Sequence, residues 1–116
     1  MARYEHLPIF KDVYDFNLHF FKLSRGFPKD IKYGLSQEIK EQTSLLLDQI
    51  ILANDNIDKR QYLKKAESCI ELIKIKTRML RDLEVLSIKS YGFIFAWLIK
   101  ISKQITAWKT WSEKEH

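Results

Sequence analysis

The sequence predicts an all-α fold, an up-down-up-down antiparallel four-helix bundle that forms one domain over residues 1–116. Glycine and proline are scarce, with three Gly and two Pro among 116 residues of which 46% are hydrophobic, a composition typical of long helices. Apolar residues recur at steps of three and four, the spacing of one helix face. Four such segments are separated by short polar stretches, which favours antiparallel neighbours.

The first predicted helix covers residues 8–25. Pro8 suits a first helical turn, where its missing N–H would have no partner. A broad aromatic stripe follows, and Gly26 and Pro28 then end the helix. The stripe consists of Phe10, Val13, Asn17, Phe20 and Ser24, with Ile9, Phe16, Leu23 and Phe27 beside it.

The second predicted helix covers residues 35–54, after a turn or short lead-in helix over residues 28–33. Its segment 45–52 is apolar nearly all round, which is typical of a helix buried on most faces. Residues 54–56 have turn chemistry, and Asp58 can cap the helix that follows.

The third predicted helix covers residues 58–83. Leu72 and Leu83 lie on the flank opposite its basic residues, together with Cys69, so its apolar surface exceeds what one partner helix covers. We therefore expect Leu72 and Leu83 in an interface between subunits of a homo-oligomer, and Cys69 as a small core residue rather than a nucleophile. The core seam is formed by Ala66, Ile70, Ile73, Thr77 and Leu80.

The fourth predicted helix covers residues 87–111, with Ser87 as its N-cap. Gly92 interrupts it at a cost of about 1 kcal/mol relative to Ala, which suggests close approach of another helix. Phe95, Trp97 and Ile99 lie off the seam and are expected to join the subunit interface. The seam keeps an unbroken three and four spacing through Tyr91, Ile94, Leu98, Ile101, Ile105 and Trp108.

Positive charge is concentrated in the C-terminal half of the chain. Residues 1–58 carry seven Lys and Arg against nine Asp and Glu, whereas residues 59–116 carry thirteen against six. A solvated helix face is the commoner origin of such an excess, but a basic helical surface also suffices for salt-sensitive binding of RNA or DNA. The residues expected to bind nucleic acid or a partner are Lys64, Lys65, Lys74, Arg78, Arg81, Lys100 and Lys103.

The sequence offers little for catalysis. It contains no Gly-rich phosphate loop, no Cys and His pair at metal spacing and no Glu-x-x-His motif. Asp12, Asp15 and His19 could meet on one helix, but such spacing is ordinary surface chemistry. We therefore expect no enzyme activity, no catalytic residue, no metal and no cofactor.

The same composition bears on location. A lone cysteine and the lack of a signal segment favour the cytoplasm. The apolar run over residues 90–99 is closed by Lys89 and Lys100 and is too short to cross a membrane.

Several motifs resemble those of one family, the accessory variability (Avd) proteins of diversity-generating retroelements. The resemblance runs from about Leu7 to Lys109. Glu84 stands where that family usually turns through Gly or another small residue. The motifs are Leu7-Pro8-Ile9-Phe10-Lys11, Tyr14-Asp15, Phe27-Pro28-Lys29, Lys32-Tyr33-Gly34-Leu35, Arg78-Met79-Leu80-Arg81-Asp82-Leu83, Ser87, Tyr91 and the tail from Ile101 to Lys109.

The resemblance implies a four-helix bundle that assembles into a barrel-like or ring-like homopentamer with positive charge outside. It implies two partners, a reverse transcriptase and its template-repeat RNA, whose mutagenic cDNA synthesis the protein supports. Arg78, Arg81 and Lys103 are the basic positions carried over from the family.

Two alternatives remain open at this point. A sister family with the same fold is encoded by intervening sequences of 23S ribosomal RNA genes; the elements at residues 33–35 and 78–83 favour Avd. An oligomeric scaffold that meets only proteins, with its charge serving solubility, is the other.

Overall fold

The computed structural model describes residues 3–115, so the ends of the predicted domain, residues 1–2 and 116, lie outside it. The described part of the chain is helical and contains no strand, which confirms the all-α prediction. A short 3₁₀ turn, η1, precedes α1. The elements are η1 (Tyr4–His6), α1 (Pro8–Ser24), α2 (Lys29–Tyr33), α3 (Leu35–Asp55), α4 (Arg60–Asp82) and α5 (Ile88–Glu115).

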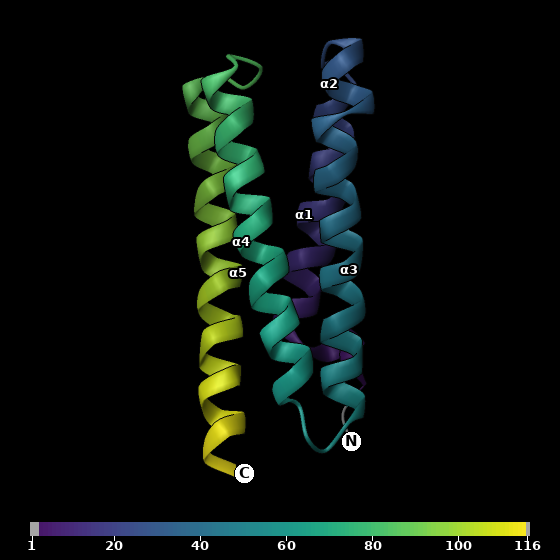
Figure 1. Ribbon diagram of the computed structural model, residues 1–116, viewed down its shortest axis with the longest axis vertical. Helices are drawn as coiled ribbons and strands as arrows, with labels where there is room; N and C mark the ends of the chain where they lie inside the picture. Colours follow the sequence, from purple (N-terminus) through teal and green to yellow (C-terminus); the bar gives the residue numbers. More distant parts are fainter. Residues whose placement is uncertain (1–2, 116) are drawn as a thin grey trace.

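The four long helices lie side by side along an axis of 45 Å, with 20 Å in each other direction. α4 packs against α3 and α5, and α1 packs against α3 and α5 from the other side. Figure 1 shows the α3 to α4 connection at one end of the molecule and the α4 to α5 connection at the other. The short α2 lies at the end where α4 turns into α5.

The core is apolar and continuous across the four long helices. The seam positions predicted for residues 66–80 and 94–105 are buried, because three and four residue steps place them on the inner faces of α4 and α5. From α1, Phe16 and Phe20 contribute stacked rings with centroids 6.1 Å apart. The largest side chains with under 2% exposure are Phe16, Phe20, Ile39, Leu46, Ile50, Leu63, Ile70, Ile73, Leu80, Ile94, Leu98 and Ile101.

The Cys69 side chain is 3% exposed and belongs to the core, as predicted. Burial raises the pKa of its thiol above the ordinary value of 9.0, because the thiolate is disfavoured in an apolar environment. The thiol's contribution to stability is therefore fully present below pH 9 and declines as pH rises through the folded pKa.

We expect Cys69 to react with a maleimide at least about 100-fold more slowly in the native protein than in urea, since labelling requires opening of the helices. Mass spectrometry over a labelling time course measures both rates. Equal rates would contradict the buried position.

Local side-chain hydrogen bonds lie at the starts of α4 and α5, although the N-cap residue of α4 is Lys59 and not the predicted Asp58. Ser87 Oγ accepts a hydrogen bond from the Ser90 N–H at 3.1 Å, which confirms the predicted cap. Asp58 Oδ1 accepts one from the Arg60 N–H at 3.2 Å. At the end of α3, Lys59 Nζ donates to the carbonyls of Ala53 and Asn56, 2.6 Å each, so this cation stabilises a helix end.

Gly92 does not mark a close approach of another helix within the chain, and that expectation is wrong. A Cβ added at Gly92 would meet no atom within 4 Å. The glycine lies on the outer face of α5 and leaves the backbone there open to solvent.

The turn after α4 is a Schellman motif. The Val85 N–H donates to the Leu80 carbonyl and the Glu84 N–H to the Arg81 carbonyl, each at 2.9 Å. Between these bonds Glu84 has φ 61°, in the left-handed region that favours glycine. The turn therefore has the backbone of a glycine turn but carries a side chain.

Glu84→Gly is expected to raise the free energy of unfolding by about 0.5–1 kcal/mol, because relief of the left-handed penalty exceeds the entropic cost of glycine. Urea denaturation followed by circular dichroism measures this. Leu83→Gly is the control; since φ at Leu83 is −81°, glycine there relieves no strain, adds backbone freedom and removes an apolar side chain, and it should destabilise the protein. Equal effects of the two substitutions would contradict the strained turn.

Candidate nucleic-acid interface

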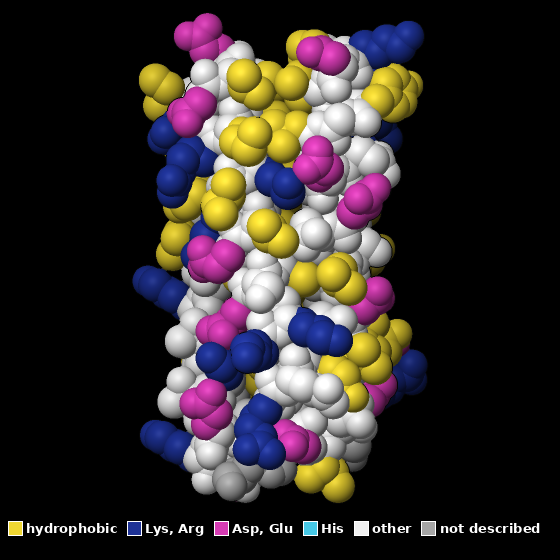
Figure 2. Space-filling model, in the orientation of Figure 1, with side chains coloured by type: hydrophobic (Ala, Val, Ile, Leu, Met, Phe, Trp, Pro, Cys, Tyr) yellow, Lys and Arg dark blue, Asp and Glu magenta, His cyan; other side chains and the backbone are white. Residues whose placement is uncertain are grey.

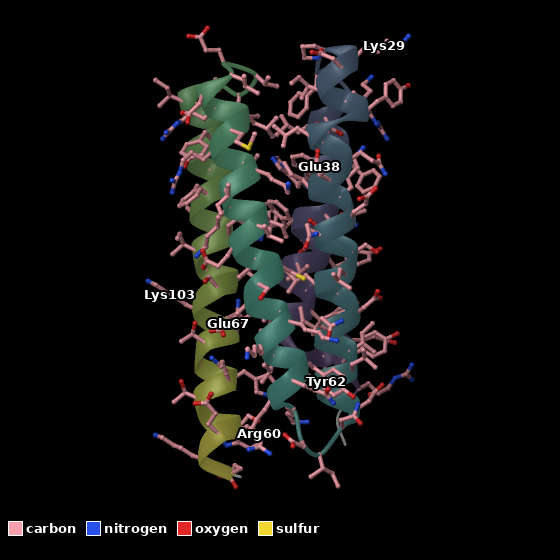
Figure 3. All side chains as sticks on the ribbon, viewed as in Figure 1. Lys29, Glu38, Arg60, Tyr62, Glu67 and Lys103 are labelled. Carbon is pink, nitrogen blue, oxygen red and sulfur yellow. The ribbon has the colours of Figure 1, made fainter. Side chains whose placement is uncertain are left out.

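Four of the seven predicted binding residues point outward and carry unpaired charge. Lys64, Lys65, Arg78 and Lys103 are exposed and have no ion pair with any residue of the described range 3–115. Figure 3 shows Lys103 extending away from α5 into solvent. These four cations are available to an anionic ligand.

Lys74, also expected to bind nucleic acid or a partner, does not point outward, because it lies largely buried between α4 and α5. Its side chain is 15% exposed and pairs with Glu71 at 3.1 Å. The ammonium also donates to Ser102 Oγ at 3.0 Å. The reason is its position on the flank of α4 that faces α5, where the long side chain reaches across the helix boundary instead of into solvent.

Arg81 and Lys100 are exposed but have partners. Arg81 pairs with the neighbouring Asp82 at 2.9 Å and lies over the Tyr91 ring at 4.7 Å. Lys100 makes a long 3.5 Å pair with Asp12, and its side chain remains 67% exposed. Such surface pairs contribute little free energy, so both cations can still turn to a phosphate.

A shallow groove of about 660 Å³ runs between α4 and α5. Glu67 and Lys109 form an ion pair across it at 2.9 Å, and Figure 3 shows Glu67 on the side of α4 next to α5. The hydrogen bond that the Lys109 ammonium donates to the Glu67 carboxylate raises the pKa of Lys109, so this lysine stays charged. The groove is lined by Lys64, Glu67, Ser68, Ile70, Glu71, Leu72, Ser102, Thr106 and Lys109.

Charge is divided unequally among the helices. α3 carries four acidic and one basic residue, α4 three acidic and seven basic, and α5 two acidic and five basic. Lys76 of α4 is tied to Glu38 of α3 at 2.7 Å, and Figure 3 shows Glu38 beside α4. The positive surface therefore spans α4 and α5 and stops at α3.

Of the predicted interface residues, Leu72 and Leu83 are 41% and 57% exposed. Figure 2 shows apolar side chains gathered on the upper half of the face that α3 and α4 present. Ile75 and Met79 join Leu72 and Leu83 in one exposed stripe on α4. The sequence reasoning missed Ile75 and Met79, although their spacing from Leu72 and Leu83 signals the same stripe.

On α5 the predicted interface residues Phe95, Trp97 and Ile99 are only partly exposed. The Trp97 indole N–H donates to the Asp12 carbonyl of α1 at 3.1 Å, and its ring meets Phe16 edge-on at 5.8 Å. Trp97 is therefore committed in large part to packing inside the chain.

Phe93 is an exposed aromatic residue that lies off the apolar seam of α5. Its side chain is 59% exposed, and its ring contacts His19 of α1 and Trp97 of α5, with centroids 5.4 and 5.7 Å apart. Phe93 and His19 are 74 positions apart in the sequence, so no local sequence pattern indicates their contact. The sign in the sequence is that Phe93 lies off the apolar seam of α5, next to the core residue Ile94.

Neither a candidate metal cluster nor a membrane-spanning helix is found among the described residues. Within residues 3–115, no three His, Cys, Asp or Glu side chains gather closely enough to hold a metal ion. Asp12 accepts a 2.7 Å hydrogen bond from Gln104, and the His19 ring lies tilted against the rings of Phe93 and Trp97. None of the described helices combines the length and apolarity needed to span a bilayer.

Comparison with known families agrees with this helical arrangement. The family model described as bAvd-like matches residues 8–111, which includes all four long helices apart from the last turn of α5.

The chain belongs to the bAvd-like family. This membership confirms the resemblance to Avd proteins that the motifs indicated. Comparison with curated proteins gives no match.

Proposed function

We propose that this protein is a non-catalytic accessory protein of a diversity-generating retroelement, which binds the reverse transcriptase and its template RNA to support mutagenic cDNA synthesis. The match to the bAvd-like family over residues 8–111 is the observation that carries the proposal. The protein acts without substrate chemistry of its own, as a surface that holds the RNA near the polymerase.

The RNA surface consists of the outward cations of α4 and α5, with Lys64, Lys65, Arg78 and Lys103 as its main contacts. Each is exposed and has no ion pair within residues 3–115. Rigid helices hold these charges in place, and phosphate contact requires no particular geometry toward the bases. Arg81 and Lys100 extend the surface when they exchange their weak surface partners for phosphates.

The protein is proposed to assemble as a homopentamer of up-down-up-down bundles in the cytoplasm. The alternating course of the long helices in Figure 1 supports this topology. The exposed apolar stripe of α4, formed by Leu72, Ile75, Met79 and Leu83, supports burial against another copy. Repetition of the basic surface around a ring would strengthen individually weak contacts.

The test measures RNA binding by fluorescence anisotropy across a salt series, with the oligomer mass followed by light scattering. Four phosphate contacts predict a fall in log affinity against log salt with a slope of about −3 to −4. A purified monomer that retains no RNA at low salt would contradict the proposal.

The alternative function is an oligomeric scaffold that binds only proteins. One observation favours it, because carboxylates of the same chain neutralise Lys74, Lys76 and Lys109. It predicts an oligomer without RNA binding at any moderate salt concentration. A reverse-transcriptase gene beside an imperfect repeat would favour the retroelement function, and placement in a ribosomal RNA operon would favour the intervening-sequence family.

A further inference from the structure

The face formed by α1 and α5 contains an aromatic hollow that the basic surface of α4 and α5 does not explain. It has a volume of about 420 Å³ and is lined by Asp12, Phe93, Ala96, Trp97 and Lys100. His19 of α1 contacts two of these lining rings, with its centroid 5.4 Å from that of Phe93 and 5.6 Å from that of Trp97. We propose that this hollow is a stacking platform for an unpaired base of single-stranded RNA, a proposal that rests on the RNA binding proposed above.

The aromatic walls of the hollow are rigid. Phe93 and Trp97 meet at 82° with centroids 5.7 Å apart. The Trp97 ring is held by an edge-on contact with the Phe16 ring and by the hydrogen bond that its N–H donates to the Asp12 carbonyl. A flat base therefore meets a preformed surface and does not have to order it, which favours binding.

The open side of Phe93 is accessible. The residue is 59% exposed, and its neighbours on the outer face of α5 are the small residues Gly92 and Ala96. No atom of another helix lies within 4 Å of a Cβ built at Gly92, so the surface of α5 beside Phe93 is open to a ligand.

The charges around the hollow fit an anionic ligand. Lys89 lies four residues before Phe93 and Lys100 seven after it, so all three share one face of α5. Lys22 lies one turn beyond His19 on α1. Lys22 and Lys89 have no ion pair with any residue between 3 and 115, so they remain available for phosphates on either side of a stacked base.

The carboxylates near the hollow already have hydrogen-bond or ion-pair partners within the chain. Asp12 accepts from Gln104 at 2.7 Å and pairs with Lys100, and Asp15 pairs with Lys11 at 2.8 Å. The hollow thus has aromatic walls and one matched pair of charges, Asp12 and Lys100, and the unpaired cations Lys22 and Lys89 lie one helical turn from His19 and Phe93. This combination is typical of single-strand binding, where bases stack on rings and the backbone follows positive charge. A cationic peptide would be repelled by Lys22 and Lys89.

The experiment compares Phe93→Ala with the unchanged protein on two probes, an oligouridylate of about twelve nucleotides and an RNA duplex of similar charge. Loss of one stacking contact is expected to lower affinity for the single strand about tenfold. Affinity for the duplex, whose bases are not available for stacking, should stay the same. Phe93→Tyr retains a flat ring and should bind both probes normally.

Phe21→Ala is the matched control, since Phe21 is 44% exposed but lies on another side of α1, beneath Lys40. It should change neither affinity. Unchanged single-strand binding by Phe93→Ala, an equal loss on both probes, or a fall in oligomer mass would each overturn the stacking platform while leaving the RNA function intact. Failure of the unchanged protein to bind either probe would remove both proposals.

Discussion

Reversing the charge of Arg78 and Lys103 together is expected to lower RNA affinity by about 100-fold. Each reversal removes a phosphate contact and introduces a repelling carboxylate, which we estimate at about tenfold per site. Both side chains are exposed and lack an ion pair within residues 3–115, so the substitutions break no internal contact. Anisotropy across a salt series should also show the slope reduced by about two, near 0.9 for each lost contact.

Arg25→Glu with Lys29→Glu is the matched control for that double reversal. It changes the net charge by the same amount at exposed positions where α1 gives way to α2; Figure 3 shows Lys29 at that end of the molecule. This pair should reduce affinity only slightly, through the long-range field. Equal losses from the two pairs would mean that RNA responds to net charge and not to the surface of α4 and α5.

Phe16→Ala is expected to lower the free energy of unfolding by about 3–5 kcal/mol. The Phe16 side chain is 1% exposed and contacts the rings of Phe20 and Trp97. Its truncation leaves a cavity between α1 and α5 that rigid neighbouring helices cannot fill. Because small domains have only about 5–15 kcal/mol of total stability, urea denaturation should place this variant near the edge of folding.

Phe21→Ala, on the same helix, is the control for burial. Its ring is 44% exposed, and its loss should cost under about 1 kcal/mol. A similar loss of stability from both substitutions would contradict the placement of the core between α1 and α5.

The helices and core were predictable because their signals are local. The spacing of three and four residues through Ile94, Leu98 and Ile101 can be read along one helix, and all three side chains are buried. The scarcity of glycine likewise indicates long helices without reference to any distant contact. The end of α4 was also predictable, since the expected last residue was 83 and the helix ends at Asp82; the left-handed backbone at Glu84 was not, because glutamate does not favour that conformation.

The candidate site was less predictable because it depends on contacts between helices. Nothing near Lys74 in the sequence indicates that its ammonium meets Ser102, 28 residues away. The pairing of Lys76 with Glu38 and the contact of Phe93 with His19 likewise join distant segments. Spacing along one helix identifies which residues share a face, but not which of them a neighbouring helix will neutralise or expose.

The unequal division of charge between α3 and the α4 and α5 pair has a kinetic consequence. A molecule with acid on one flank and base on the other has a dipole across its short dimension, and a polyanion exerts a torque on that dipole before contact. Within roughly a Debye length, about 8 Å at physiological ionic strength, this torque orients the surface of α4 and α5 toward the polyanion. A larger share of collisions with the proposed RNA partner therefore lead to binding.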